Sequence, residues 1–232
     1  MNVITTISSS VEYVPGANRL PDYTELEVKN EPMLFNCDYE GATINGGPIT
    51  QDFLNELPHE WRQCREVPLV IDSRVHMLMP GWYPCIPGWH HDDVPRTRSD
   101  GQPNYAPGQC RSEHIMALVN GDICPTEFAI GNRAFYEPEL GRTIYADWHK
   151  EVEHACQIGE LRRLSCPTNR LVHFDDRTWH RGTPTRANGW RFFIRASRYF
   201  DPDGNPIARG NARTNEVRRQ VQVYMDNVNA GW

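Results

Sequence analysis

Two histidines and two aspartates form an unbroken run, His90-His91-Asp92-Asp93, and His180 follows ninety residues after the first of them. On an extended segment, residues two apart project to the same face, so His90 and Asp92 can act together. A histidine returning from a later strand would complete two imidazoles and one carboxylate around a metal ion. Such a set leaves one side of the metal open and is typical of non-heme Fe(II) sites.

The pattern His-x-Asp is weak by itself because the chain contains it three times. The pair His173/Asp175 has only His180 downstream, five residues beyond Asp175, which is too close to cross a barrel. The other two pairs both have His180 at a workable distance. Two registers therefore stay open, His90/Asp92 and His91/Asp93, beside the alternative that the run is a polar surface loop after a proline bend.

A strand that carries cations begins nine residues after His180. On an extended segment 189–197, Arg191 and Arg195 share one face. A buried arginine needs an anion, and it can hold a carboxylate through two parallel hydrogen bonds. An oxo acid such as 2-oxoglutarate has such a carboxylate. Arg191 is preferred for its spacing from His180, with Arg195 as the second candidate and a surface ion pair as the alternative.

The bulk composition predicts one domain over residues 1–232. The 18 prolines and 17 glycines indicate many turns and few long helices. No apolar run approaches membrane-spanning length, and the first residues show neither a basic nor a long apolar stretch, so no signal peptide is expected. The seven cysteines are scattered without a CxxC pair, which favours reduced thiols and a cytoplasmic location.

The charge is distributed unevenly along the chain. From residue 161 onward there are 13 arginines and 6 acidic residues, although the whole chain has a net charge of −6. An arginine-rich C-terminal third would favour an anionic ligand near the predicted site, unless these arginines only form ordinary surface pairs. The overall acidity argues against an extended nucleic-acid footprint.

Short elements dense in turns predict a mainly β fold, a double-sheet jelly roll with a few flanking helices. An irregular arm over residues 1 to about 30, with one or two short strands, flanks a core over residues 68–199. The metal ligands are expected to point inward from opposite sheets. His149 and His154 lie five apart on a predicted helix and are expected to be solvated. The predicted strands are 67–79, 114–119, 126–130, 160–164, 170–174, 178–182 and 190–199, with a turn at 131–132, and the predicted helices are 51–65 (interrupted by Pro58), 144–157 and 214–225.

Residues 68–199 resemble the Fe(II)- and 2-oxoglutarate-dependent oxygenase superfamily. The resemblance is carried by WHHD (89–92), CPTEFAIG (124–131), WHRGTP (179–184) and GWRFFIRAS (189–197). It implies a double-stranded β-helix core that binds Fe(II), 2-oxoglutarate and O2. The implied activity is that of a dioxygenase that hydroxylates a C–H bond of an unidentified substrate while 2-oxoglutarate is oxidatively decarboxylated to succinate. Trp89 before the first ligand favours His90, Asp92 and His180 as the metal ligands and catalytic residues, with Arg191 or Arg195 binding the oxo acid.

Two other function classes remain open. A cupin-like protein would bind a metal without using 2-oxoglutarate, and a jelly-roll binding module would bind no metal. Neither requires an inward-facing arginine on segment 189–195. For an oxygenase, the aromatic residues near the site suit a small-molecule or nucleotide-type substrate; they are Trp82, Tyr83, Trp89 and Tyr105.

Overall fold

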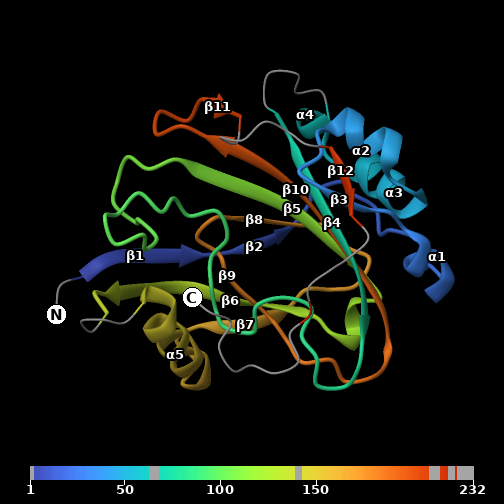
Figure 1. The fold of residues 1–232 in the computed structure, drawn as a ribbon. Coiled ribbons are helices and arrows are strands. Elements are labelled where there is room, and N and C mark those ends of the chain that lie inside the picture. Colours follow the sequence, from blue (N-terminus) through green and yellow to red (C-terminus); the bar gives the residue numbers. More distant parts are fainter. Residues whose placement is uncertain (1–2, 63–67, 139–142, 209–214, 219–222, 224–232) are drawn as a thin grey trace.

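The computed structural model describes residues 3–62, 68–138, 143–208, 215–218 and 223. Two antiparallel sheets lie face to face, with helices on the outer side of each (Figure 1). Helices α1 to α4 cover the larger sheet and α5 covers the smaller one. The predicted fold class, mainly β with a jelly-roll core and few helices, is confirmed.

The larger sheet contains six strands, and β10 and β5 form its centre. Within β10, Phe192, Ile194 and Ala196 pack under the helices, while Arg191 and Arg195 face the other sheet, as the alternation of side chains predicts. Its strands are β11 (Pro206–Ile207) and β4 (Val70–Leu78), which both pair with β10 (Gly189–Phe200), followed by β5 (Arg111–Val119), β8 (Val172–Asp175) and β2 (Val11–Tyr13).

The smaller sheet is built around one long strand, β6, which pairs with the other three. Its strands are β1 (Val3–Ser9), β6 (Thr126–Tyr136), β7 (Arg162–Ser165) and β9 (Trp179–Gly182). Because β1 belongs to this sheet and β2 to the larger one, the N-terminal arm crosses between the sheets and ties them together. A separate two-stranded sheet pairs β3 (Met33–Phe35) with β12 (Glu216–Arg218).

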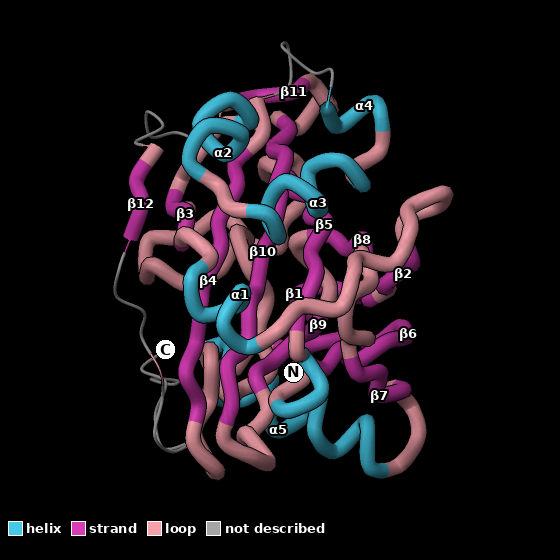
Figure 2. The backbone as a smooth tube through the Cα atoms, turned by 90° about the vertical axis from the view of Figure 1, so that its right-hand side faces the viewer, coloured by secondary structure: helices cyan, strands magenta, loops and turns pink. Residues whose placement is uncertain are grey.

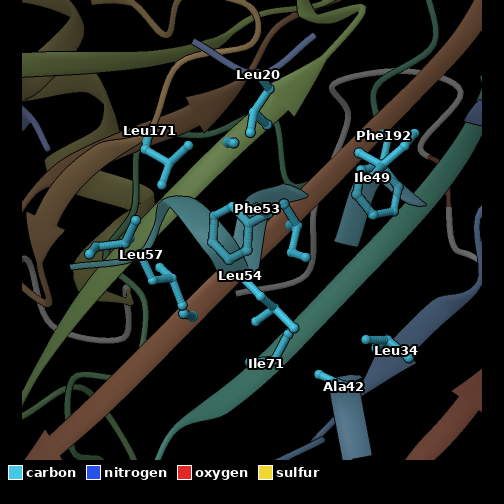
Figure 3. Packing of buried hydrophobic residues seen from close by; sticks show 14 of the residues in the cluster. Leu20, Leu34, Ala42, Ile49, Phe53, Leu54, Leu57, Ile71, Leu171 and Phe192 are labelled. Carbon is cyan, nitrogen blue, oxygen red and sulfur yellow. The ribbon is translucent and has the colours of Figure 1, made fainter. Parts of the chain in front are cut away.

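Helices pack on the outer face of the larger sheet through a continuous apolar cluster. Phe53 and Leu54 of α3 gather with Ile71 of β4 and Phe192 of β10 (Figure 3). The view turned by 90° shows α1, α2 and α3 as a layer over β4 and β10 (Figure 2). The helices are α1 (Glu25–Asn30), α2 (Tyr39–Asn45), α3 (Pro48–Glu56), α4 (His59–Arg62) and α5 (Ile144–Gln157), with a 3₁₀ turn at Gly121–Ile123.

Pro58 lies at an element boundary, whereas Gly131 lies where a predicted boundary is absent. Pro58 separates α3 from α4, as expected of a residue that cannot continue a helix. The predicted turn at 131–132 is wrong, because β6 runs on to Tyr136 and pairs with β1 there. Gly131 has φ +139°, a conformation that residues with side chains rarely adopt, so a glycine at this position allows the strand to continue.

The predicted C-terminal helix 214–225 is wrong for Glu216–Arg218, which form β12 on the edge of β3. Residues 214, 219–222, 224 and 225 of that prediction lie outside the described residues. Alternation of valine with polar residues in this segment suits an edge strand as well as a helix, and pairing with β3 decides between them.

None of the helices in the described ranges has the length and apolar character needed to cross a membrane. The six cysteines in the same ranges are all free thiols.

A buried carboxylate fixes the start of α3 to the loop between α1 and β3. Glu31 accepts hydrogen bonds from the backbone N–H groups of Gly47 (3.0 Å), Ile49 (3.2 Å) and Thr50 (2.9 Å). The Thr50 hydroxyl donates to the same carboxylate at 2.6 Å. These donors are the ones that a helix N-terminus leaves without intrahelical partners.

Replacing Glu31 with alanine should therefore lower the free energy of unfolding by about 2–4 kcal/mol, because buried donors would lose a charged acceptor. Urea unfolding followed by circular dichroism would measure this. Glu12→Ala, at an exposed position of β2, should change stability by no more than about 0.5 kcal/mol. Equal effects of the two substitutions would contradict the role assigned to Glu31.

Candidate metal centre

His90 and His180 lie directly opposite each other in an antiparallel bridge. The His90 N–H donates to the His180 carbonyl at 3.0 Å, and the His180 N–H donates to the His90 carbonyl at 3.1 Å. Opposite residues of such a pair present their side chains on the same face. The two imidazole centroids lie 4.5 Å apart.

The prediction that the ligands come from opposite sheets is therefore wrong. His180 belongs to β9 of the smaller sheet, and the segment around His90 extends the same sheet by pairing with β9. The reason is that the edge of β9 away from β6 leaves backbone N–H and C=O groups unpaired, and the backbone of His90 forms hydrogen bonds with them.

Asp92 completes a group of three side chains. One ligand atom from each of His90, Asp92 and His180 lies within 4.8 Å of the other two. The Nε2 atoms of His90 and His180 are 3.7 Å and 3.4 Å from the Asp92 carboxylate. Donor atoms about 2.1 Å from one metal and at right angles would be about 3 Å apart, so small side-chain movements would accommodate an ion.

Backbone carbonyls orient both imidazoles. His90 Nδ1 lies 2.7 Å from the Gly88 carbonyl, and His180 Nδ1 lies 2.9 Å from the Thr178 carbonyl. Since a carbonyl oxygen only accepts, Nδ1 carries a proton in each ring, and Nε2 is the ring atom left to bind a metal. Burial, followed by the nearby His180, lowers the pKa of His90 to about 4, which keeps its imidazole neutral.

The structure separates the two possible ligand registers. His91 points to the opposite face, where its ring stacks on Trp179 at 3.7 Å between centroids and its Nδ1 lies 2.7 Å from the Tyr105 hydroxyl. Asp93 has a left-handed backbone with φ +59°, and its carboxylate accepts from the Tyr199 hydroxyl at 3.2 Å. Only the register His90/Asp92 brings its side chains to His180 in the described part of the chain.

Arg195 forms ion pairs with Asp92 and Asp93. Its guanidinium forms a hydrogen-bonded ion pair with Asp92 and lies 3.5 Å from the Asp93 carboxylate. Burial would raise the pKa of Asp92, but His180 and Arg195 outweigh it and hold this pKa well below its usual value. Asp92 is thus kept ionised, as a metal ligand must be.

Arg191 lies in the same cavity without an acidic partner. Its side chain is 2% exposed, and its Nη2 donates to the Thr126 hydroxyl at 3.1 Å. Its Nε has no hydrogen-bond partner, and no carboxylate lies within 4.0 Å of it in the described ranges. A buried guanidinium in this state is costly unless a ligand supplies an anion.

The cavity between the sheets has a volume of about 350 Å³ and joins these groups. It reaches from the triad to Arg191 and Thr126. It also includes residues that the sequence analysis did not select, namely Phe35, Asp72, Arg74, His76 and Cys85. A signal for three of them was present, because the polar residues 72, 74 and 76 recur at every second position of a strand whose other residues, apart from Ser73, are apolar.

The segment that carries His90 is anchored from α5. His149 Nδ1 accepts from the Trp89 N–H at 2.9 Å, and Glu153 accepts from the Trp89 indole at 3.0 Å. Arg181, next to His180, lies over the Trp89 ring at 4.4 Å and pairs with Glu153 at 2.8 Å. The expectation that His149 is solvated is wrong, since it holds the backbone beside a candidate ligand.

No protein-family model matches the chain, and a comparison with curated proteins found no match either. A comparison with solved structures found the crystal structure of EvdO2 from Micromonospora carbonacea var. aurantiaca complexed with 2-oxoglutarate. The alignment covers 90% of this chain and 81% of that chain, at 13% sequence identity and a TM-score of 0.40. Similarity at this level transfers neither an activity nor the role of a residue.

The adjacent histidines allow a matched test of the register. The protein should bind one equivalent of Mn(II), used in place of air-sensitive Fe(II), and His90→Ala should weaken this binding at least 100-fold. His91→Ala should lower the melting temperature, because a stacked ring is lost, but change the dissociation constant less than threefold. Isothermal titration calorimetry on folded protein measures the dissociation constants of both variants, and thermal unfolding measures their melting temperatures. The opposite ranking would assign the metal to the His91 face.

Buried neutral histidines predict a pH dependence of stability. Burial is the largest cause that lowers the pKa of His76, to about 3, and of His114, well below its usual value. In the unfolded chain the histidine pKa is near 6.5, so between about pH 6.5 and 3 the unfolded chain binds more protons than the folded protein. Stability is therefore complete above about pH 7 and is lost as the pH falls from about 6.5 toward 3.

In metal-free protein, urea unfolding between pH 7 and 5 should show each such histidine contributing up to about 1.4 kcal/mol per pH unit. His76→Gln should reduce the slope by that amount while the other buried histidines keep theirs. Identical slopes for wild type and His76→Gln would show that His76 is not held neutral.

Proposed function

We propose that the protein is an Fe(II)- and 2-oxoglutarate-dependent oxygenase that hydroxylates a C–H bond of a small substrate. The observation that carries the proposal is the shared cavity, which contains the triad His90, Asp92 and His180 together with Arg191. The guanidinium of Arg191 has no carboxylate partner among the described residues. A metal site alone would leave the buried Arg191 unexplained.

The donor set fits Fe(II). Two imidazoles and one carboxylate would hold the metal and leave other coordination positions free. Bound together, Fe(II), 2-oxoglutarate and O2 would supply an oxidant that places one oxygen atom on the substrate and the other in succinate, with release of CO2.

The remaining chain groups would position the oxo acid. Arg191 offers unused N–H donors, and the Thr126 hydroxyl, which accepts from Arg191, keeps its own hydrogen to donate. The two would hold the far carboxylate of 2-oxoglutarate. Arg195, already paired with Asp92 and Asp93, would instead keep the carboxylate ligand in place. These assignments separate the two arginines that the sequence left as alternatives.

The arginine assignment predicts a selective defect. Arg191→Gln should weaken binding of 2-oxoglutarate roughly 100-fold, since a buried charged pair is worth several kcal/mol, while binding of Fe(II) stays within about twofold of wild type. Anaerobic titration, followed by the visible charge-transfer absorption of the Fe(II)–2-oxoglutarate complex, measures both affinities. Arg170→Gln, at an exposed position, is the charge-matched control.

Release of succinate from 2-oxoglutarate under air would then report the activity itself. If Fe(II) binds but 2-oxoglutarate does not at millimolar concentration, the oxygenase proposal fails and a cupin-like metal protein replaces it. If no metal binds, both fail.

A further inference from the structure

Strand β4 lines the cavity with two opposite charges that neither the metal nor the oxo acid requires. Asp72 and Arg74 are two residues apart and project to the same face of β4, into the cavity. Across the sheet, Asp72 is opposite Arg195 and Arg74 is opposite Phe193. Because Arg195 contacts Asp92, this wall adjoins the triad.

Asp72 is a buried carboxylate with unused acceptor capacity. It is 6% exposed and accepts one hydrogen bond, from the Asn36 N–H at 2.9 Å. Its neighbour Arg195 is turned toward Asp92 and Asp93. In the described ranges no cationic side chain lies within 4.0 Å of Asp72, although an ionised carboxylate has about four acceptor positions.

Arg74 is the complementary case. Its Nη1 donates to the carbonyls of Leu34 (3.1 Å) and Ser73 (2.7 Å), and its guanidinium lies 5.5 Å from the centre of the Phe35 ring. No carboxylate of the described residues lies within 4.0 Å of it. The other guanidinium N–H groups keep their capacity to bind an anion.

We infer that this wall binds the substrate of the proposed oxygenase, and that the substrate is a small zwitterion of the amino-acid class. The ammonium group would pair with Asp72 and the carboxylate with Arg74. Residues two apart on a strand are separated by about 7 Å, so an α-amino acid can contact both side chains at once. This inference rests on the proposed function for the reaction but on β4 alone for the recognition.

The two charges exclude simpler substrate classes at this wall. An acid without an amino group would repel the Asp72 carboxylate and leave it unpaired. An amine without a carboxylate would repel the Arg74 guanidinium and leave it unpaired. A cavity of about 350 Å³ that also holds an oxo acid suits a small molecule.

Calorimetry with the twenty common L-amino acids, added one at a time to anaerobic protein, tests the inference. The screen is run with Mn(II) and 2-oxoglutarate and again without them, so that recognition is tested even if the proposed function fails. At least one amino acid should bind. Its amide, which lacks the carboxylate, and its 2-hydroxy acid, which lacks the ammonium group, should each bind at least tenfold more weakly.

Two substitutions locate the binding. Asp72→Asn keeps an oxygen for Asn36, and Arg74→Gln keeps donors for the two carbonyls, so both should fold; each should weaken amino-acid binding at least tenfold. Neither should change the affinity for 2-oxoglutarate more than twofold. Asp203→Asn, on an exposed turn, and Arg96→Gln, which lines a neighbouring hollow next to Asp92, are the matched controls.

The outcomes are distinct from those for Arg191. The inference is overturned if no amino acid binds in either state, if the analogues bind as well as the parent, or if Arg96→Gln is the damaging change. It is also overturned if the β4 variants weaken binding of 2-oxoglutarate instead, because Asp72 and Arg74 would then belong to the co-substrate site.

Discussion

The candidate centre depends on the two backbone hydrogen bonds between His90 and His180. Side chains alternate along paired strands, so this one register sends both imidazoles and Asp92 into the cavity. The same register sends His91 and Trp179 to the opposite face, where they stack. A shift by one residue would exchange the ligands for packing residues, and the anchors on α5 through Trp89 oppose such a shift.

The larger sheet adds the charges by the same rule. Arg191 and Arg195 lie on one face of β10 but have different environments. Arg195 faces the segment 90–93 and is neutralised by its aspartates, whereas Arg191 lies toward β6 and, among the described residues, hydrogen-bonds only to a hydroxyl. Position along the strand, rather than residue type, therefore decides which arginine remains available to an anionic ligand.

Alternation and spacing predicted the parts of this protein that depend on local order. They include the mainly β fold, the inward face of segment 189–197, and α5, where Ile144, Trp148 and Val152 repeat at helical spacing. They could not predict which edge pairs with segment 90, because pairing between distant segments depends on tertiary contacts, and so the ligands were wrongly expected on opposite sheets. The same limit hid β12 and the role of His149, whose partners are far away in the sequence.

The distribution of packing explains how the fold accommodates an electrostatically unfavourable interior. Apolar clusters cover the outer faces of both sheets and part of the space between them, whereas the cavity contains Asp72, Arg74 and Arg191 without ion partners within 4.0 Å in the described ranges. Well-packed apolar residues there would often be more stable than such charges. Their cost to the ligand-free protein falls only when ions of opposite charge enter, and any ligand that binds the folded state alone stabilises it. Under the proposed function, the apolar clusters would hold the fold of the ligand-free protein, and binding of metal, oxo acid and substrate would neutralise the charges in the cavity.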